Sequence, residues 1–507
     1  MIPRDYNAAE DLIGRNLKAG RGAKVAFIDD AGQCTYAELA ERANRFGNGL
    51  KALGIGMEDR VMLAMLDCIE WPVAFLGSIR AGIIPIATNT LLTTKDYDFM
   101  LGDSRAKALI VSEALLPAFA PLLGKFPFLE HVIVAGKAGA GQLAFAEVAA
   151  KGGPDLAPAP TTSDDACFWL YSSGSTGTPK GTVHLHASMI LTAELYAKPV
   201  LGIREDDVVY SAAKFFFAYG LGNSLSFPMA VGATAVVTAE RPTPDSVFKR
   251  IVEKQPTIFY GVPTLYAALL ASPAFPEKGR HRLRVCTSAG EALPAEIGRR
   301  WTEKTGTEIL DGIGSTEMLH IFMSNRPGEV RYGTSGKPVP GYKVKVADDA
   351  GNVVKAGEVG DLYISGPTSA SQYWNQREKS RATFQGEWTK SGDKYAFDDD
   401  GYYTYAGRSD DMLKVSGIYV SPVEVEAALI SHAAVLEAAV VGADDENRLV
   451  KPKAFIVLKP GASATTEELQ AFVKEKLAPY KYPRWIEFVA ELPKTATGKI
   501  QRFKLRG

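Results

Sequence analysis

The sequence predicts an α/β protein with a mixed α+β C-terminal part. Residues 23–160 alternate apolar, strand-like runs with amphipathic, helix-like segments, which is typical of a parallel sheet covered by helices. Between residues 257 and 317, three apolar strands each end in a loop of small residues. The chain becomes strand-rich from Gly333, and the segment after Asp411 has a rhythm of its own. We therefore expect a large N-terminal domain of α/β subdomains with a β-rich subdomain, and a small α+β C-terminal domain.

The length and composition support two domains in a soluble protein. The 507 residues exceed what one hydrophobic core usually supports, and 46% hydrophobic with 23% charged residues is ordinary for a globular chain. With 57 basic and 58 acidic residues the net charge is −1, which gives no electrostatic reason to expect nucleic acid or an anionic membrane as a partner. We place the domain boundary between residues 1–409 and residues 410–507.

The cysteines and the N-terminus indicate a cytoplasmic protein. Four cysteines lie far apart in apolar surroundings, without metal-ligand spacing, which predicts buried thiols in a reducing compartment. Residues 1–18 are polar and lack the apolar core of a signal peptide. No apolar run reaches transmembrane length. The cysteines are Cys34, Cys68, Cys167 and Cys286.

The first segments follow the α/β pattern closely. Residues 24–29 are predicted to form a strand, and Thr35 with Glu38 forms the capping box that begins an amphipathic helix. The continuous apolar run at 61–66 suits a parallel strand that is buried on both faces. The helix-to-strand order then repeats over residues 76–86.

Residues 171–181 are predicted to form a phosphate-binding loop. Three glycines, five Ser or Thr hydroxyls and Lys180 stand in these eleven residues. Glycine lets the backbone approach a ligand, hydroxyls donate to oxyanions, and a lysine adds a mobile positive charge. Apolar strands are expected on both sides, at 166–171 and 182–186, so a plain surface linker is the weaker alternative. The phosphate-binding candidates are Ser172, Ser173, Gly174, Ser175, Thr176, Gly177 and Lys180.

This loop is not a Walker loop. Counted from Gly174, the pattern G-x-x-x-x-G-K-[ST] requires a glycine where Pro179 stands and a Ser or Thr where Gly181 stands. The segment that follows is predicted to be a strand, so no helix N-terminus is available for the phosphate. The sequence therefore excludes a P-loop ATPase.

An aromatic cluster follows at residues 214–222. Four aromatic side chains in five positions indicate either plain core packing or a flat apolar pocket sized for an aromatic acid. The cluster contains no acidic side chain to pair with an ammonium group, which weighs against amino-acid substrates.

The three strands at 257–263, 285–291 and 308–317 predict a ligand crevice, because the carboxyl ends of such strands meet at one edge of a sheet. Glu317 emerges at this edge. Mg²⁺ is usually bound by one or two carboxylates together with substrate phosphates, so Glu317 is a candidate metal ligand. The alternative is a solvated loop acid.

Further polar candidates follow toward the C-terminus. Asp393 could accept two hydrogen bonds from ribose hydroxyls, and Arg408 could add a charge-assisted one, although each taken singly is more often a surface residue. In the C-terminal unit we expect helices from Pro422 and over 466–477, with strands at 438–442 and 453–458. Lys499 lies in a Gly/Thr turn near the C-terminus, and taken alone it would be expected to be a solvent-exposed residue at the tip of that turn.

In this order the segments resemble the adenylate-forming enzymes, which comprise acyl-CoA synthetases, carrier-loading adenylation domains and luciferases. The resemblance covers essentially the whole chain and rests on five motifs. They are the phosphate loop, the Thr-Glu motif at 314–317, the ribose-binding motif with Asp393, the hinge motif at 407–410, and the motif at 493–499 that carries the family's catalytic lysine. The closer similarity is to benzoate-type CoA ligases. It depends on residues 216–223, 311–320 and 414–422, and residues 4–9 are similar to 4-hydroxybenzoate-CoA ligases.

Two positions depart from the family pattern. Ile313 stands where most members place an aromatic ring near adenine, so stacking would become aliphatic contact. Phe217 stands where many aryl and fatty acyl ligases place a histidine, so a gating histidine is not expected at this position.

The resemblance implies two half-reactions that use ATP, Mg²⁺ and coenzyme A. A carboxylate and MgATP form acyl-AMP and pyrophosphate, and the CoA thiol then displaces AMP. Ser172, Ser173, Thr176 and Lys180 would hold the β- and γ-phosphates, and Thr316 the α-phosphate. Glu317 would hold Mg²⁺, and Lys499 would bridge the carboxylate and the α-phosphate. The C-terminal domain would be mobile and would rotate about Asp410 between the two steps.

The resemblance also implies the remaining site residues. Against the nucleotide we expect Ser288, Ala289, Gly290, Glu291, Asp311, Gly312, Ile313, Gly314, Asp393 and Arg408. Against the aromatic ring we expect Phe217, Ala218, Tyr219, Gly220, Met318, Leu319 and His320. For His320 the alternative is a satisfied core histidine.

Several alternatives stay open at this point. An enzyme that adenylates another carboxylic acid, or one that loads a carrier protein, shares every motif, although the sequence ends at Gly507 without a carrier. Two further alternatives are a luciferase-like oxygenase and a nucleotide-sensing binding protein without catalytic activity. We expect an aromatic carboxylate, ATP and CoA as partners, and neither nucleic acid nor membrane. The ring substituent and a homodimeric state are left open.

Overall fold

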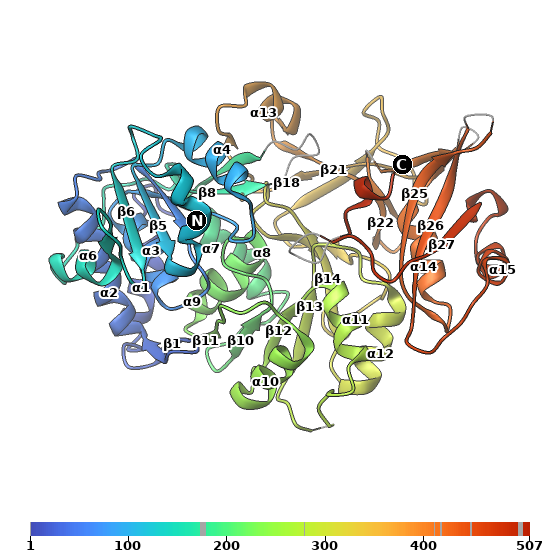
Figure 1. Ribbon diagram of the computed structural model, residues 1–507, viewed down its shortest axis with the longest axis horizontal. Helices are drawn as coiled ribbons and strands as arrows, with labels where there is room; N and C mark the ends of the chain where they lie inside the picture. The colour runs from blue at the N-terminus through green and yellow to red at the C-terminus, as the bar shows by residue number, and fades with distance from the viewer. Residues whose placement is uncertain are drawn as a thin grey trace.

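The computed structural model describes residues 2–172, 179–277, 279–409, 411–415, 418–446, 449–494 and 500–506. Two large sheets and a five-stranded sheet form the N-terminal part, and a three-stranded sheet with two helices forms a separate C-terminal part (Figure 1). This arrangement confirms the predicted α/β class with an α+β C-terminal unit.

The first large sheet has eight strands and contains the predicted buried parallel strands. Val61 and Leu63 pack toward α2 and α3, whereas Met62 and Ala64 face α4 and α5. Because helices cover both faces, β3 is apolar at consecutive positions, as the run at 61–66 predicted. In spatial order the strands are β19 (Gln372–Tyr373), β9 (Lys180–Leu185), β8 (Ala166–Ser172), β4 (Ile84–Ala87), β3 (Arg60–Ala64), β5 (Ala108–Ser112), β6 (His131–Ala135) and β7 (Leu143–Ala144).

One helix of this region, α2, begins where the sequence predicts, whereas the helix predicted at 76–80 begins earlier, at Glu70. At α2, the Thr35 Oγ1 accepts a hydrogen bond from the Glu38 N–H at 3.2 Å, and the Glu38 carboxylate accepts one from the Thr35 N–H at 2.7 Å, which is the expected capping box. The helices are α1 (Ala8–Lys18), α2 (Tyr36–Ala52), α3 (Glu70–Arg80), α4 (Thr94–Ser104), α5 (Leu116–Phe119) and α6 (Phe145–Lys151), with short turns η1 (Glu113–Leu115) and η2 (Ala120–Leu122).

The second large sheet has nine strands and carries the three strands that end in small-residue loops. The predicted strand at 24–29 joins this sheet as β1, parallel to β11, rather than the sheet of its sequence neighbours. In spatial order the strands are β16 (Lys337–Pro338), β15 (Ile321–Ser324), β14 (Ile309–Gly314), β13 (Val285–Ser288), β12 (Ile258–Gly261), β10 (Val208–Ser211), β11 (Thr234–Val236), β1 (Val25–Ile28) and β2 (Gln33–Thr35).

Helices cover both faces of the second sheet as well. One face packs against α10 (Pro244–Lys254), α11 (Pro263–Ala271) and α12 (Ala295–Thr305). The opposite face shares one large core with the first sheet, and the short segments between them belong to this core. These segments are α7 (Ser188–Thr192), η3 (Ala193–Ala197), α8 (Ala218–Leu221), η4 (Gly222–Ser226) and α9 (Phe227–Val231).

The strand-rich region after Gly333 forms a five-stranded antiparallel sheet, as predicted. Figure 1 shows it between the two large sheets and the C-terminal part. Its elements are β17 (Lys343–Ala347), β18 (Gly360–Ser365), α13 (Arg377–Thr383), β20 (Phe384–Gln385), β21 (Trp388–Phe397) and β22 (Tyr403–Arg408).

The C-terminal part has its own core, in which Val425 and Leu429 of one helix and Val473 of the other pack on the sheet. The predicted strands and helices at 422–477 are all present. The elements are β23 (Leu413–Val415), β24 (Ile418–Val420), α14 (Pro422–Ile430), β25 (Val435–Asp444), β26 (Val450–Leu458), α15 (Thr466–Lys476), η5 (Pro479–Lys481), β27 (Trp485–Phe488) and η6 (Arg502–Lys504).

The four cysteines are free, and Cys34, Cys167 and Cys286 are buried as predicted, whereas Cys68 is only half-buried. Burial raises the pKa of the Cys34 thiol to about 11 and that of Cys286 to about 12, so both are neutral packing groups. Within the described part of the chain, no helix combines the length and the apolar character that crossing a membrane requires.

Candidate active site

The three strands that predicted a crevice lie side by side. β12, β13 and β14 are parallel neighbours, with Gly261 paired to Ser288 and Ser288 paired to Asp311. Their carboxyl ends therefore lie at the same edge of the second sheet, as the sequence predicted. The expected nucleotide contacts Ala289, Gly290 and Glu291 follow β13, and Gly312, Ile313 and Gly314 end β14.

The predicted phosphate loop connects two antiparallel strands. β8 and β9 pair with Ser172 opposite Lys180, so the loop joins strands and no helix follows it directly. The candidates Ser173, Gly174, Ser175, Thr176 and Gly177 lie outside the described residues and stay predictions. The same holds for Lys499 and for the hinge residue Asp410.

Lys180, at the start of β9 in the first sheet, and Glu317, in the turn after β14 of the second sheet, come together. The Lys180 Nζ lies 3.6 Å from the Glu317 Oε1, and both side chains are largely buried, with 19% and 17% exposed. The hydroxyl of Tyr373 contacts both groups, at 3.1 Å from Lys180 and 2.6 Å from Glu317. The structure thus places the lysine of the phosphate loop beside the acid of the Thr-Glu motif. Sequence reasoning did not find Tyr373, because its distance along the chain gives no signal of this contact.

A buried histidine holds the Thr-Glu turn. The Nε2 of His184 lies 2.8 Å from the backbone carbonyl oxygen of Thr316. The ring stacks on Phe168 with 5.3 Å between centroids, and burial lowers the pKa of His184 to about 4. The neutral imidazole can therefore donate from Nε2 to the carbonyl group. Sequence reasoning missed His184, which it treated only as part of the strand after the phosphate loop.

The next residues of this turn are conformationally unusual. Leu319 has a φ of +67°, a left-handed conformation that bulky side chains rarely adopt and that is found mainly at functional sites. It directs the chain so that Met318 and His320 are both buried. No sequence signal predicted this backbone.

Buried polar groups line the end of β13 and β14. Ser288 and Asp311 are register partners, and both side chains are buried. Burial raises the pKa of the Asp311 carboxyl well above its usual range. The Asp311 carbonyl oxygen also accepts hydrogen bonds from the backbone and the side-chain amide of Asn325, at 2.9 and 3.1 Å, which fixes the strand end.

Asp393 and Arg408 lie on neighbouring strands and face each other. They are register partners on β21 and β22, and an Arg408 nitrogen lies 3.1 Å from the Asp393 carboxylate. Asp393 is 8% exposed. The structure therefore brings the two predicted ribose contacts into one ion pair.

The aromatic cluster divides between core and half-buried positions. Phe215 and Phe216 are buried core residues, which agrees with plain packing for these two. Phe217, Ala218 and Tyr219 are only half-buried, where α8 begins. The part of the cluster that predicted a pocket is thus the part that is not sealed in the core, while Gly220 behind it is buried.

His320 lies against this cluster. Its ring centroid is 5.5 Å from that of Tyr219 and 4.4 Å from that of Phe227, and its Nε2 lies 3.1 Å from the Asn223 Oδ1. Burial lowers the pKa of His320 to about 3, so the ring is neutral. His320 is hydrogen-bonded as the core-histidine alternative expects, and it also borders the predicted ring pocket.

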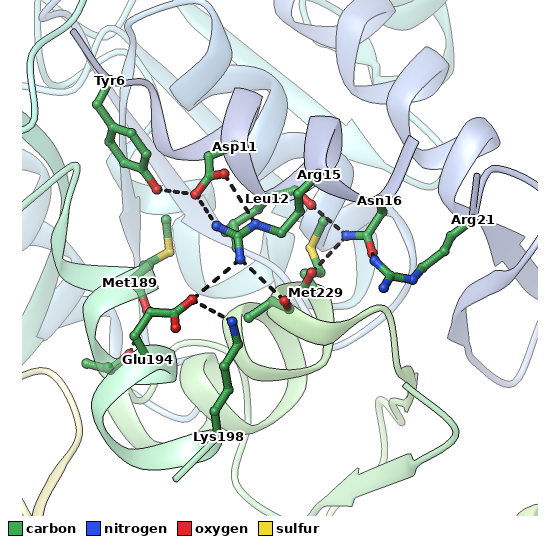
Figure 2. A network of polar contacts seen from close by, with 12 residues as sticks. Tyr6, Asp11, Leu12, Arg15, Asn16, Arg21, Met189, Glu194, Lys198 and Met229 are labelled. Carbon is green, nitrogen blue, oxygen red and sulfur yellow. Dashed lines mark hydrogen bonds and ion pairs between the residues drawn. The ribbon is translucent and has the colours of Figure 1, made fainter. Parts of the chain in front are cut away.

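A polar network ties α1 to η3 and α9 (Figure 2). Arg15 forms an ion pair with Asp11 at 2.7 Å and donates to the carbonyl oxygen of Ala230 in α9 at 3.3 Å. The Asn16 amide donates to the carbonyl oxygen of Met229 at 2.8 Å. Phe227 of α9 contacts His320, so the network fixes the helix that packs against this histidine.

A cavity of about 500 Å³ lies on the other side of Tyr373, over β19 and α13. Its walls include Trp374, Gln376, Arg377 and Arg381. The Gln376 side-chain amide donates to the carbonyl oxygen of Pro179 at 3.2 Å, so the cavity adjoins the end of the phosphate loop.

Comparison with known proteins agrees with this geometry. A family model described as "AMP-binding enzyme" matches residues 15–374, and one described as "AMP-binding enzyme C-terminal domain" matches residues 424–499. The chain is 66% identical to a benzoate–CoA ligase of Thauera aromatica, covering 100% of this chain and 96% of the relative. It is 50% identical to a 4-hydroxybenzoate–CoA/benzoate–CoA ligase of Rhodopseudomonas palustris, covering 99% and 94%.

Solved structures show the same likeness. A benzoate CoA ligase from Burkholderia xenovorans superimposes with a TM-score of 0.93 at 57% identity, covering 99% of this chain and 100% of that one. An anthranilate CoA ligase in complex with anthranoyl-AMP gives a TM-score of 0.95 at 48% identity, covering 99% and 97%. The chain therefore belongs to the AMP-binding enzyme family, which is the adenylate-forming superfamily that its motifs predicted.

Proposed function

We propose that this protein is an ATP-dependent aryl-CoA ligase. It activates benzoate or a hydroxy- or otherwise substituted benzoate with ATP as the acyl-AMP, releasing pyrophosphate, and the CoA thiol then displaces AMP to form the thioester. The observation that carries this proposal is the meeting of Lys180 and Glu317 at the edge of the second sheet, next to a half-buried aromatic cluster. The high identity to benzoate–CoA ligases over the full chain supports the same activity.

The first half-reaction brings a carboxylate to an already anionic phosphate, so positive charge must compensate. In the proposed mechanism Lys180 holds the β- and γ-phosphates together with the phosphate-loop residues, and Thr316 binds the α-phosphate. Lys499 bridges the attacking carboxylate and the α-phosphate. His184 supports this arrangement because its hydrogen bond to the Thr316 carbonyl keeps the Thr-Glu turn in place.

Glu317 is suited to hold Mg²⁺. It presents a carboxylate beside the lysine that would bind the phosphates. Among the described residues, no three His, Cys, Asp or Glu side chains are placed so that they could hold a metal ion together, and Mg²⁺ typically needs only one or two carboxylates besides substrate phosphates. When bound there, Mg²⁺ supplies positive charge that neutralises the phosphate oxygens.

The adenosine contacts follow from the strand ends. Asp393 would accept hydrogen bonds from the ribose hydroxyls and is oriented by Arg408. Ser288, Asp311 and Ile313 lie at the ends of β13 and β14 and would face the adenine side. After adenylation, rotation of residues 410–507 about Asp410 would withdraw Lys499 and admit CoA.

The proposed acyl pocket is apolar and uncharged. Phe217, Ala218 and Tyr219 would border the ring, with neutral His320 at their side. None of Phe217 to Gly220 and Met318 to His320 is acidic, so an ammonium group would find no partner there. This favours a benzoate over an amino acid. Four free cysteines support a reducing location such as the cytoplasm.

The decisive experiment measures pyrophosphate release with ATP, Mg²⁺ and a panel of carboxylic acids, each with and without CoA. We expect release with benzoate or 4-hydroxybenzoate and multiple turnovers only with CoA. Release only with fatty or amino acids would contradict the aromatic pocket, and turnover without CoA would contradict the ligase. ATP binding without release for any acid would favour a nucleotide-binding protein.

A further inference from the structure

Tyr373 links the strand that begins with Lys180 to the turn that carries Glu317. It lies in β19, which pairs with β9 so that Tyr373 stands opposite Thr182, two residues after Lys180. The backbone N–H of Trp374 donates to the carbonyl oxygen of Gly181 at 2.7 Å. On the other side, the N–H of Ala370 donates to the carbonyl oxygen of Glu317 at 2.7 Å. The segment around Tyr373 therefore fixes the backbones of both Lys180 and Glu317.

The Tyr373 hydroxyl contacts both charged groups and forms a triangle with them. Its hydroxyl donates to the Glu317 Oε1 at 2.6 Å and accepts from the Lys180 Nζ at 3.1 Å, while the ammonium lies 4.3 Å from the ring centroid. Tyr373 is 2% exposed, and its N–H donates to Ser380 at 3.0 Å, so the ring has little freedom. A phenol is protonated at neutral pH, so the hydroxyl is available as a donor.

The hydroxyl determines how close the opposite charges come. A direct charge-assisted hydrogen bond has a length of about 2.7–2.9 Å, whereas Lys180 and Glu317 are 3.6 Å apart. A hydroxyl has one proton to donate and lone pairs to accept, so Tyr373 satisfies both groups at once. Glu317 keeps its orientation even when Lys180 moves toward a phosphate.

We propose that Tyr373 is a positioning residue that orients Glu317 toward the metal and prevents a tight ion pair between Glu317 and Lys180. The proposal rests on the function proposed above, because it takes Glu317 and Lys180 as the ligands of Mg²⁺ and of the phosphates. Without the hydroxyl, the two charges close on each other, and MgATP has to separate them before it binds. Tyr373 then acts on MgATP binding and adenylation and has no part in thioester formation.

The test compares Tyr373→Phe with a matched variant, Tyr402→Phe. Phenylalanine keeps the ring beside Lys180 and removes only the hydroxyl. Tyr402 lies outside the proposed site, and its hydroxyl donates one hydrogen bond, to the neutral Glu329 carbonyl oxygen at 3.1 Å. Calorimetric titration of each protein with MgATP, and with ATP in the presence of a chelator, measures binding without any acyl substrate.

We expect Tyr373→Phe to weaken MgATP binding by on the order of tenfold, the usual worth of a hydrogen bond to a charged group, with a smaller effect on ATP alone. Tyr402→Phe should bind like the wild type. In a double-mutant cycle, Tyr373→Phe should add little to Glu317→Gln, because both act through one contact. Thioester formation from synthetic benzoyl-AMP and CoA should be unchanged, which also shows that the variant is folded.

An unchanged dissociation constant for MgATP in Tyr373→Phe would overturn the proposal. So would an effect that adds fully to that of Glu317→Gln, or an equal slowing of both half-reactions. The two proposals fail separately. If the wild type releases no pyrophosphate with any acid but Tyr373→Phe still loses MgATP affinity, the positioning role stands and the ligase function falls.

Discussion

The guanidinium of Arg502 donates two hydrogen bonds to the carboxylate of Glu426, at 2.8 Å from Nη2 to Oε2 and 3.1 Å from Nε to Oε1. Glu426 also accepts the backbone N–H of Val440 at 2.8 Å, and it is 6% exposed. Arg502 follows Lys499 by three residues, and Lys494 on the other side pairs with Glu437 at 2.7 Å. Two ion pairs thus anchor the chain on both sides of the proposed catalytic lysine.

Glu426→Gln should destabilise the C-terminal part. Removing one partner of a buried ion pair leaves an uncompensated charge and costs about 3–5 kcal/mol. The free energy of unfolding, measured by urea denaturation, should fall accordingly, and adenylation should slow because the anchor of the lysine segment is lost. Glu424→Gln is the control: Glu424 pairs with Lys481 at 2.7 Å but is more exposed, so the loss should be below about 1 kcal/mol. Equal losses in the two variants would contradict the prediction.

Acid should destabilise the N-terminal part through three buried histidines. Burial lowers the pKa of His184 and His186 to about 4 and that of His320 to about 3, from 6.5 when exposed. Between the folded-state pKa and 6.5, the unfolded chain binds more protons than the folded protein. The contribution of these histidines to the free energy of unfolding is therefore fully present above pH 6.5 and is lost as the pH decreases toward 4. At about 1.4 kcal/mol per pKa unit, His184 and His186 each contribute up to about 3 kcal/mol to this dependence, and His320 contributes up to about 5 kcal/mol.

This prediction is tested by urea denaturation of the protein between pH 7.5 and 5, in which the midpoint of the transition of the N-terminal part is measured at each pH. In His186→Gln, the free energy of unfolding should fall less steeply with decreasing pH, by the slope that corresponds to about one proton. His186 accepts the backbone N–H of Ala8 at 3.1 Å and lies outside the proposed site, so its effect on activity at pH 7.5 should be small. If the stability of this variant depends on pH as steeply as that of the wild type, His186 is not one of the titrating groups.

Lys499→Ala should slow acyl-AMP formation by about a thousandfold or more. A unit charge about 4 Å away at an effective dielectric constant of ~20 is worth ~4 kcal/mol, which corresponds to roughly three decades of rate. Pyrophosphate release in single-turnover experiments measures this step. Thioester formation from preformed benzoyl-AMP should survive, because the domain rotation would already have withdrawn the lysine. Equal loss in both steps would refute the rotation.

Ala218→Leu should exclude para-substituted benzoates before benzoate itself. The half-buried Ala218 begins α8 between Phe217 and Tyr219, so added bulk would project into the proposed ring pocket. The ratio of kcat/KM for 4-hydroxybenzoate to that for benzoate should fall. The kcat/KM for benzoate serves as the internal reference, and an unchanged ratio would remove Ala218 from the pocket wall.

Gly222→Ala should displace His320. A Cβ at Gly222 would lie 2.3 Å from the His320 ring and 3.0 Å from Phe227, and such overpacking costs about 1–3 kcal/mol. Thermal denaturation should show the loss, and the KM for benzoate should rise while MgATP affinity is retained. Gly32→Ala, where nothing lies within 4 Å of the added Cβ, is the control and should be nearly neutral. A benzoate KM unaffected in Gly222→Ala would separate His320 from the acyl site.

Much of the fold follows from local sequence. The capping box of Thr35 and Glu38 begins α2, and the apolar run at 61–66 contains a strand buried on both faces, because caps and periodicity act within a few residues. The assignment of residues 24–29 to the second sheet could not be predicted. Strand pairing depends on long-range packing, and a short apolar strand matches many partners equally well.

The sequence by itself determined the α/β class, the order of the motifs, the family and the residues of the proposed site, because residue types and their spacing carry this information. Only the tertiary structure decided which of them meet: Lys180 with Glu317, Asp393 with Arg408, and His320 with Tyr219. It also introduced Tyr373 and His184, which no motif indicated. Their roles arise from hydrogen bonds between distant segments, and such contacts exist only after the sheets have packed together.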